Sequence, residues 1–119
     1  MPDKVVRIAK SLKLLFLTDS KVIRLQEELQ TIHVRSRALL DEASRQLKKL
    51  TPDGITLMSS VKHLVRVSEE SIEKCVLCMA SGEHRMARSY YSSASRQLEL
   101  LKDKCDRLTV VVRNVRRKL

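Results

Sequence analysis

The chain of 119 residues contains only two glycines and two prolines, which leaves little material for the turns of a strand-rich fold. Its hydrophobic fraction of 43% can fill the core of one modest domain, and no apolar run approaches the roughly 18 residues that cross a bilayer. The formal net charge of +10 suggests an acidic partner, an anionic membrane or a nucleic acid.

A short helix is predicted over residues 3–17, because apolar residues recur there every three or four positions. These residues are Val5, Ile8, Leu12 and Leu15. The next apolar stripe is out of phase with this one, and the change coincides with Thr18, Asp19 and Ser20, which favour helix N-caps. We expect a break at this point, although a continuous first and second helix stays an open alternative.

A long second helix is predicted from about residue 20 to residue 50, with Leu40 and Leu47 beside its apolar stripe. The stripe comprises Val22, Leu25, Leu29, Ile32, Ser36, Leu39, Ala43 and Leu50. The segment from Thr51 to Gly54 ends this helix, because Pro52 cannot continue it and suits the start of the next one. A third helix is then expected over about residues 54–80, ending at Ser81 and Gly82.

The fourth helix has the most regular pattern in the chain, with apolar positions spaced alternately four and three apart. They are Ala87, Tyr91, Ala94, Leu98, Leu101, Cys105, Leu108, Val112, Val115 and Leu119. This coiled-coil-like spacing keeps one stripe against neighbouring helices from about Glu83 to the C-terminus. The β-branched residues 109–112 have weaker helix propensity, so we expect tertiary contacts to hold them helical.

The predicted architecture is an all-α, antiparallel bundle of three long helices plus a shorter N-terminal helix. At 1.5 Å per residue the long helices would measure roughly 40–50 Å and the first one roughly 22 Å, and short connections make consecutive long helices antiparallel. Residues 1–119 are interpreted as one helical-bundle domain, either whole or excised from a larger protein. If the first helix folds back, the two chain ends approach each other, and if it merges with the second, they separate.

Cys75 and Cys78 form the only motif typical of a metal or redox site, since thiolates three positions apart share a helical face. A zinc site needs four ligands, and a redox pair usually follows a strand, so we interpret both residues as core cysteines.

His33 and His63 are interpreted as surface or boundary residues. We expect no enzyme activity, no metal, no cofactor and no small-molecule substrate. The odd number of cysteines fits a reducing compartment, so the predicted location is the cytoplasm or the nucleus.

Residues 71–101 resemble a known helical hairpin. The matching runs are Ser71-Ile72-Glu73-Lys74-Cys75, Ser81-Gly82-Glu83, Ala87-Arg88-Ser89-Tyr90-Tyr91-Ser92-Ser93-Ala94 and Leu98-Glu99-Leu100-Leu101. They are similar to the first hairpin of microtubule-interacting-and-trafficking (MIT) domains, three-helix bundles that bind short helical motifs between their helices. Ala87, Tyr91 and Ala94 match the small, aromatic, small interlock of that hairpin, which tetratricopeptide helices share. The resemblance implies a groove for a partner helix.

Two groups of residues are candidates for binding. Apolar residues off the main stripes would stay exposed unless another chain or the first helix covers them. They are Ile23, Val34, Leu100 and Val110. Basic residues gather near both chain ends, where they either dock an acidic surface or serve only solubility. They are Lys4, Arg7, Lys10, Lys13, Arg113, Arg116, Arg117 and Lys118.

The sequence therefore predicts a non-catalytic scaffold, adaptor or regulatory module that binds a helix or acidic surface of another protein, or that self-associates as a homodimer. The alternative is an electrostatic binder of anionic membrane or nucleic acid through the basic ends.

Overall fold

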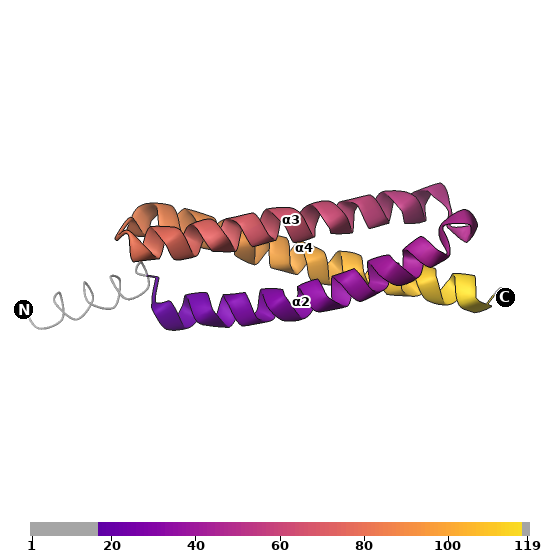
Figure 1. Cartoon of the computed structure of the whole chain (residues 1–119), viewed down its shortest axis with the longest axis horizontal. Coiled ribbons are helices and arrows are strands. Elements are labelled where there is room, and N and C mark those ends of the chain that lie inside the picture. Colours follow the sequence, from indigo (N-terminus) through magenta and orange to yellow (C-terminus); the bar gives the residue numbers. More distant parts are fainter. Residues whose placement is uncertain (1–16, 118–119) are drawn as a thin grey trace, which may run out of the picture.

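The computed structural model describes residues 17–117, which form three long α-helices side by side in an antiparallel bundle (Figure 1). The elements are α2 (Asp19–Arg45), the 3-10 helix η1 (Leu47–Lys49), α3 (Pro52–Ala80) and α4 (His84–Arg117). The predicted all-α class is confirmed. The described part has three helices and not four: residues 3–16 of the expected N-terminal helix lie outside the described residues, and Leu17 is not helical.

The predicted break before α2 is confirmed. Thr18 has an extended backbone and is the N-cap of α2, because its side-chain oxygen accepts a hydrogen bond from the Lys21 amide at 3.3 Å. This bond satisfies one of the amides that have no partner within the helix, and Asp19 in the first turn complements the helix dipole. Leu17 is buried with Val22, so the residues on both sides of the cap contribute to the core.

The predicted end of the second helix at residue 50 is wrong, because α2 ends at Arg45 and the chain continues as η1. A 3-10 helix has about 3.0 residues per turn instead of 3.6, so the apolar spacing of α2 no longer applies after residue 45. Leu50 is buried, but Leu47, expected beside the stripe, is 48% exposed. Thr51 then caps α3 by accepting from the Gly54 amide at 3.2 Å, and Pro52 occupies the first turn.

The turn between α3 and α4 is built by Gly82, as the sequence predicted. Gly82 has a φ of 76°, a left-handed conformation that side chains with a Cβ disfavour. The Glu83 amide bonds the Cys78 carbonyl at 2.9 Å and the Gly82 amide bonds the Met79 carbonyl at 3.2 Å. This is the hydrogen-bond pattern of a Schellman motif, which satisfies the last carbonyls of α3 before α4 begins.

The stripe of α4 is the centre of the core, as its spacing predicted. Leu101, Cys105 and Leu108 are fully buried, and they pack in one cluster with residues of α2 and α3. The β-branched segment is helical because Val112 is also buried and Thr109 Oγ1 donates to the Cys105 carbonyl at 2.7 Å. Leu119, the last predicted member of the stripe, lies outside the described residues.

Candidate interaction site

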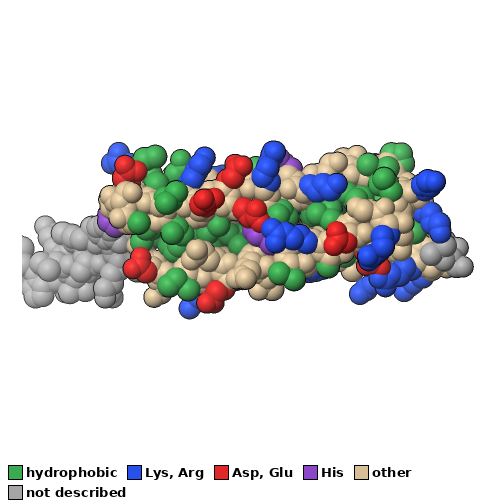
Figure 2. Space-filling model, viewed as in Figure 1, with side chains coloured by type: hydrophobic (Ala, Val, Ile, Leu, Met, Phe, Trp, Pro, Cys, Tyr) green, Lys and Arg blue, Asp and Glu red, His purple; other side chains and the backbone are tan. Residues whose placement is uncertain are grey.

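A groove between α2 and α3 is the candidate binding site. It has a volume of about 340 Å³. It is lined by Gln26, Leu29, Gln30, His33, Val34, Arg37, Glu69 and Ile72. Leu29 is buried beneath it and Ile72 is half-buried, so part of its lining is apolar. Figure 2 shows hydrophobic side chains between α3 and α2 along this face, next to a histidine and charged residues.

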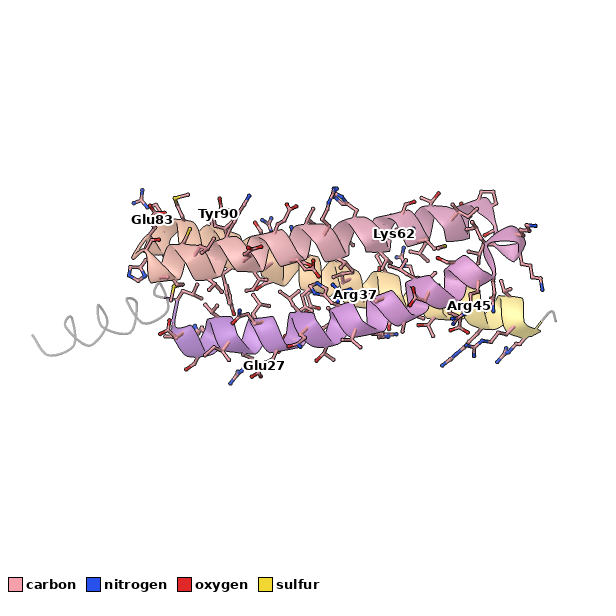
Figure 3. The ribbon with its side chains drawn as sticks, in the orientation of Figure 1. Glu27, Arg37, Arg45, Lys62, Glu83 and Tyr90 are labelled. Carbon is pink, nitrogen blue, oxygen red and sulfur yellow. The ribbon has the colours of Figure 1, made fainter. Side chains whose placement is uncertain are left out.

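A polar cluster forms part of the same groove. His33 Nε2 and Ser68 Oγ are hydrogen-bonded at 2.7 Å, and Ser68 Oγ also lies 3.0 Å from the Val65 carbonyl, to which its hydroxyl can donate. The Arg37 guanidinium donates to Glu69 Oε1 at 2.5 Å, and this oxygen lies 3.7 Å from His33 Nδ1. Figure 3 shows Arg37 on the side of α2 that faces α3.

The prediction that His33 lies at the surface or the boundary is wrong, because only 6% of this residue is exposed. His33 follows Leu29 by four positions and precedes Ser36 by three, which places it at the edge of the α2 stripe. That spacing is the feature of the sequence from which the burial of His33 could have been predicted. The spacing along α2 could not show that Ser68 of α3 gives the imidazole a buried hydrogen-bond partner. His63, in contrast, is exposed and contacts Arg66 at 3.2 Å.

Burial makes the stability of the bundle depend on the protonation of His33. Burial lowers the pKa of His33, the Glu69 carboxylate opposes this by raising it, and the Arg37 guanidinium lowers it further. The unfolded chain therefore binds a proton more readily than the folded one, and the free energy of unfolding is expected to fall as the pH drops below about 6.5.

Urea unfolding on both sides of that pH should show that the free energy of unfolding depends less on pH in His33→Asn than in wild type. His63→Asn is the control, and equal pH dependence in wild type and His33→Asn would contradict this prediction.

The four apolar candidates are exposed but do not form one surface. Ile23 is 53%, Val34 62%, Leu100 50% and Val110 54% exposed. Ile23 and Val34 are eleven positions apart and share one side of α2, about 20° apart around its axis. Leu100 and Val110 belong to another helix, α4, and lie about 80° apart around it. Of the four residues, only Val34 lines the groove between α2 and α3.

A second groove, between α2 and α4, is larger, and more of its exposed lining is apolar. Its volume is about 450 Å³. It is lined by Glu28, Thr31, Ile32, Arg35, Lys102 and Asp106. Ile32 is the single aliphatic residue among these, and Arg35 bonds Asp106 at 2.8 Å across the two helices. The groove between α2 and α3 differs in having three aliphatic side chains in its lining, Leu29, Val34 and Ile72, of which Val34 is one of the predicted apolar candidates.

The cysteines are buried, as the sequence indicated. Burial and the nearby Cys78 raise the pKa of the Cys75 thiol, and burial and the Glu83 carboxylate raise the pKa of the Cys78 thiol. Cys105 is hydrogen-bonded to Ser36 at 3.1 Å. Within residues 17–117 no three His, Cys, Asp or Glu residues are grouped so that they could hold a metal ion. Raised thiol pKa values disfavour the thiolate that metal binding and nucleophilic attack need.

The bundle brings further basic residues to the C-terminal end of α4. Arg113, Arg116 and Arg117 are exposed there, while the candidates Lys4, Arg7, Lys10, Lys13 and Lys118 lie outside the described residues. The junction of α2 and α3 lies at the same end of the bundle (Figure 1), and an ion pair joins Arg116 to Glu42. The junction adds the exposed residues Arg45, Lys48 and Lys49. The sequence analysis missed them because it counted charge along the chain.

Comparisons with known proteins do not identify the chain. No protein-family model, curated protein or solved structure matches it. None of the helices between residues 17 and 117 combines the length and the apolar character needed to cross a membrane.

Proposed function

We propose that this chain is a non-catalytic interaction module, of the scaffold, adaptor or regulatory kind, that binds an amphipathic helix of another protein in the groove between α2 and α3. The observation that supports this most directly is the position of Val34, which is 62% exposed on the lining of a groove that also contains Leu29 and Ile72. Covering Val34 and the exposed part of Ile72 would remove apolar surface from water. The proposed location remains the cytoplasm or the nucleus.

The lining of the groove supports the binding of an amphipathic helix. An amphipathic helix places its apolar face against apolar residues and leaves polar residues at the edges, and a fourth helix is a common addition to an antiparallel bundle. The Arg37 and Glu69 pair and the side chains of Gln26 and Gln30 would contact polar groups of the partner. The resemblance of residues 71–101 to MIT domains supports the same mode, since that segment forms the end of α3 and the first half of α4.

The test compares two matched substitutions on the full chain. Val34→Asp places a charge in the groove, and Val110→Asp places the same charge at a residue of α4 that is similarly exposed. Proteins retained from cell lysate by each variant would be quantified by mass spectrometry. We expect at least one protein to be retained by both wild type and Val110→Asp. The retained amount of this protein should fall by at least about tenfold with Val34→Asp, since a charge buried without a partner costs more than 1.4 kcal/mol.

Two outcomes separate the alternatives. A set of retained proteins that is the same for wild type and Val34→Asp would contradict binding in this groove. If sedimentation of the purified chain instead shows a dimer that Val34→Asp dissociates, the groove binds a second copy of this chain and not a partner protein.

A further inference from the structure

The end of the bundle where α2 joins α3 combines basic and apolar side chains on one exposed surface. We define the basic tip as the exposed residues Arg45, Lys48, Lys49, Arg113, Arg116 and Arg117. Three acidic residues lie near it, Asp41, Glu42 and Asp53, and Glu42 is paired with Arg116. The basic residues thus outnumber the acidic ones by two to one at this end. Figure 2 shows the blue side chains gathered there.

Exposed apolar residues lie within the same region. Leu47 is 48% exposed in η1, directly between Gln46 and the basic residues Lys48 and Lys49. Ile55, in the first turn of α3, is 43% exposed. Leu47 is not among the residues that pack in the two core clusters of the described chain. About half of this apolar residue is therefore available to contact a partner beside the cations.

We propose that the basic tip docks the bundle end-on against an anionic membrane surface, with Leu47 entering the headgroup region. Lys and Arg side chains near an anionic bilayer are attracted to it, and an apolar side chain gains free energy in the boundary between headgroups and acyl chains. The long alkyl stems of Lys48 and Lys49 can lie beside Leu47 in the headgroup region, while their ammonium groups remain close to the lipid phosphates. This surface is separate from the groove between α2 and α3, so the inference does not depend on the proposed function.

The apolar residue favours lipid over nucleic acid as the partner. The apolar side chain of Leu47 would gain no binding free energy against a phosphate backbone. Stacking on bases would need aromatic side chains. The described aromatic residues, Tyr90 and Tyr91, lie on the first half of α4, toward the opposite end of the bundle (Figure 3). The tip therefore provides charge and an aliphatic anchor without a stacking platform.

The test measures sedimentation of the full chain with vesicles of phosphatidylcholine alone and of phosphatidylcholine mixed with phosphatidylserine. We expect binding only to the mixed vesicles, and we expect Lys48→Glu with Lys49→Glu to reduce the partition coefficient by more than about tenfold, because two attractive charges become repulsive. The matched control is Lys21→Glu with Arg85→Glu, which makes the same change in net charge at the opposite end of the bundle and should retain most of the binding.

A second pair of variants tests the apolar anchor. Leu47→Ser should weaken binding by about threefold or more at every salt concentration, since partial insertion of a leucine does not depend on ionic strength. Leu77→Ser, at a residue that is 59% exposed near the other end of α3, should leave binding unchanged. Circular dichroism would establish that all variants are folded.

Three results would overturn the proposal. The first is that wild type remains in the supernatant with the mixed vesicles. The second is an equal loss of binding by both charge-reversal variants, which would indicate a general effect of net charge. The third result is binding of wild type to duplex DNA or to single-stranded RNA that requires Lys48 and Lys49 and that mixed vesicles do not compete away. That result would assign the basic tip to nucleic acid.

Discussion

Replacing Leu101 with alanine is expected to lower the free energy of unfolding by about 2–5 kcal/mol. Leu101 is fully buried in the stripe of α4 and packs with residues of all three described helices in the main core cluster. The substitution loses the transfer free energy of the removed methyl groups and leaves a cavity that a close-packed bundle fills only in part. Urea unfolding followed by circular dichroism at 222 nm, a wavelength set by helical backbone, measures the change.

The adjacent residue provides a control with the same chemistry. Leu100 is 50% exposed, so Leu100→Ala should change the free energy of unfolding by less than about 0.5 kcal/mol. Both substitutions remove the same atoms from neighbouring positions of one helix. Equal effects of the two variants would mean that the stripe of α4 does not face the core.

A larger loss is expected for Leu29→Asp, which places a carboxylate in the contact between α2 and the other two helices. Leu29 is 1% exposed and belongs to the main core cluster. The substitution loses the burial of the leucine and adds the desolvation of a charged group, so the cost should exceed about 4 kcal/mol. Since domains are stable by only about 5–15 kcal/mol, most or all of the cooperative thermal transition should disappear.

The control for Leu29→Asp is Val34→Asp, five positions further along α2. Val34 is 62% exposed, so its carboxylate stays hydrated and the melting temperature should remain close to that of wild type. This result is also needed for the binding experiment, in which Val34→Asp must remain folded. A cooperative transition retained by Leu29→Asp at the wild-type temperature would show that α2 does not depend on this contact.

The sequence predicted most of the fold because its main signals are local. The alternating spacing of Leu98, Leu101 and Cys105 identifies the buried side of α4 without reference to any other helix. Thr18, Thr51 and Gly82 determine where helices begin or end through hydrogen bonds within a few residues. The end of α2 was predicted wrongly, because the apolar residues Leu47 and Leu50 continue its pattern although the backbone changes to a 3-10 turn.

The candidate sites were predicted less completely, because each one joins residues from different helices. The exposure of Val34 could be read from its spacing, but the groove exists only because Ile72 and Glu69 of α3 lie opposite it. The buried hydrogen bond between His33 and Ser68 has the same origin, since the two residues are 35 positions apart. The spacing of a single helix shows which side is apolar, and it contains no information on which residues of another helix face it.

The sequence by itself determined that this protein is helical, where its turns lie and which stripe of α4 is buried. The tertiary structure alone decided that Arg45, Lys48 and Lys49 join Arg113 and Arg117 at one end of the bundle, with Leu47 exposed among them. The physical reason is that hydrogen bonds and apolar periodicity act over one or two helical turns, whereas the grouping of charges depends on how antiparallel helices align along their axes. That alignment is set by side-chain packing over the whole length of the helices.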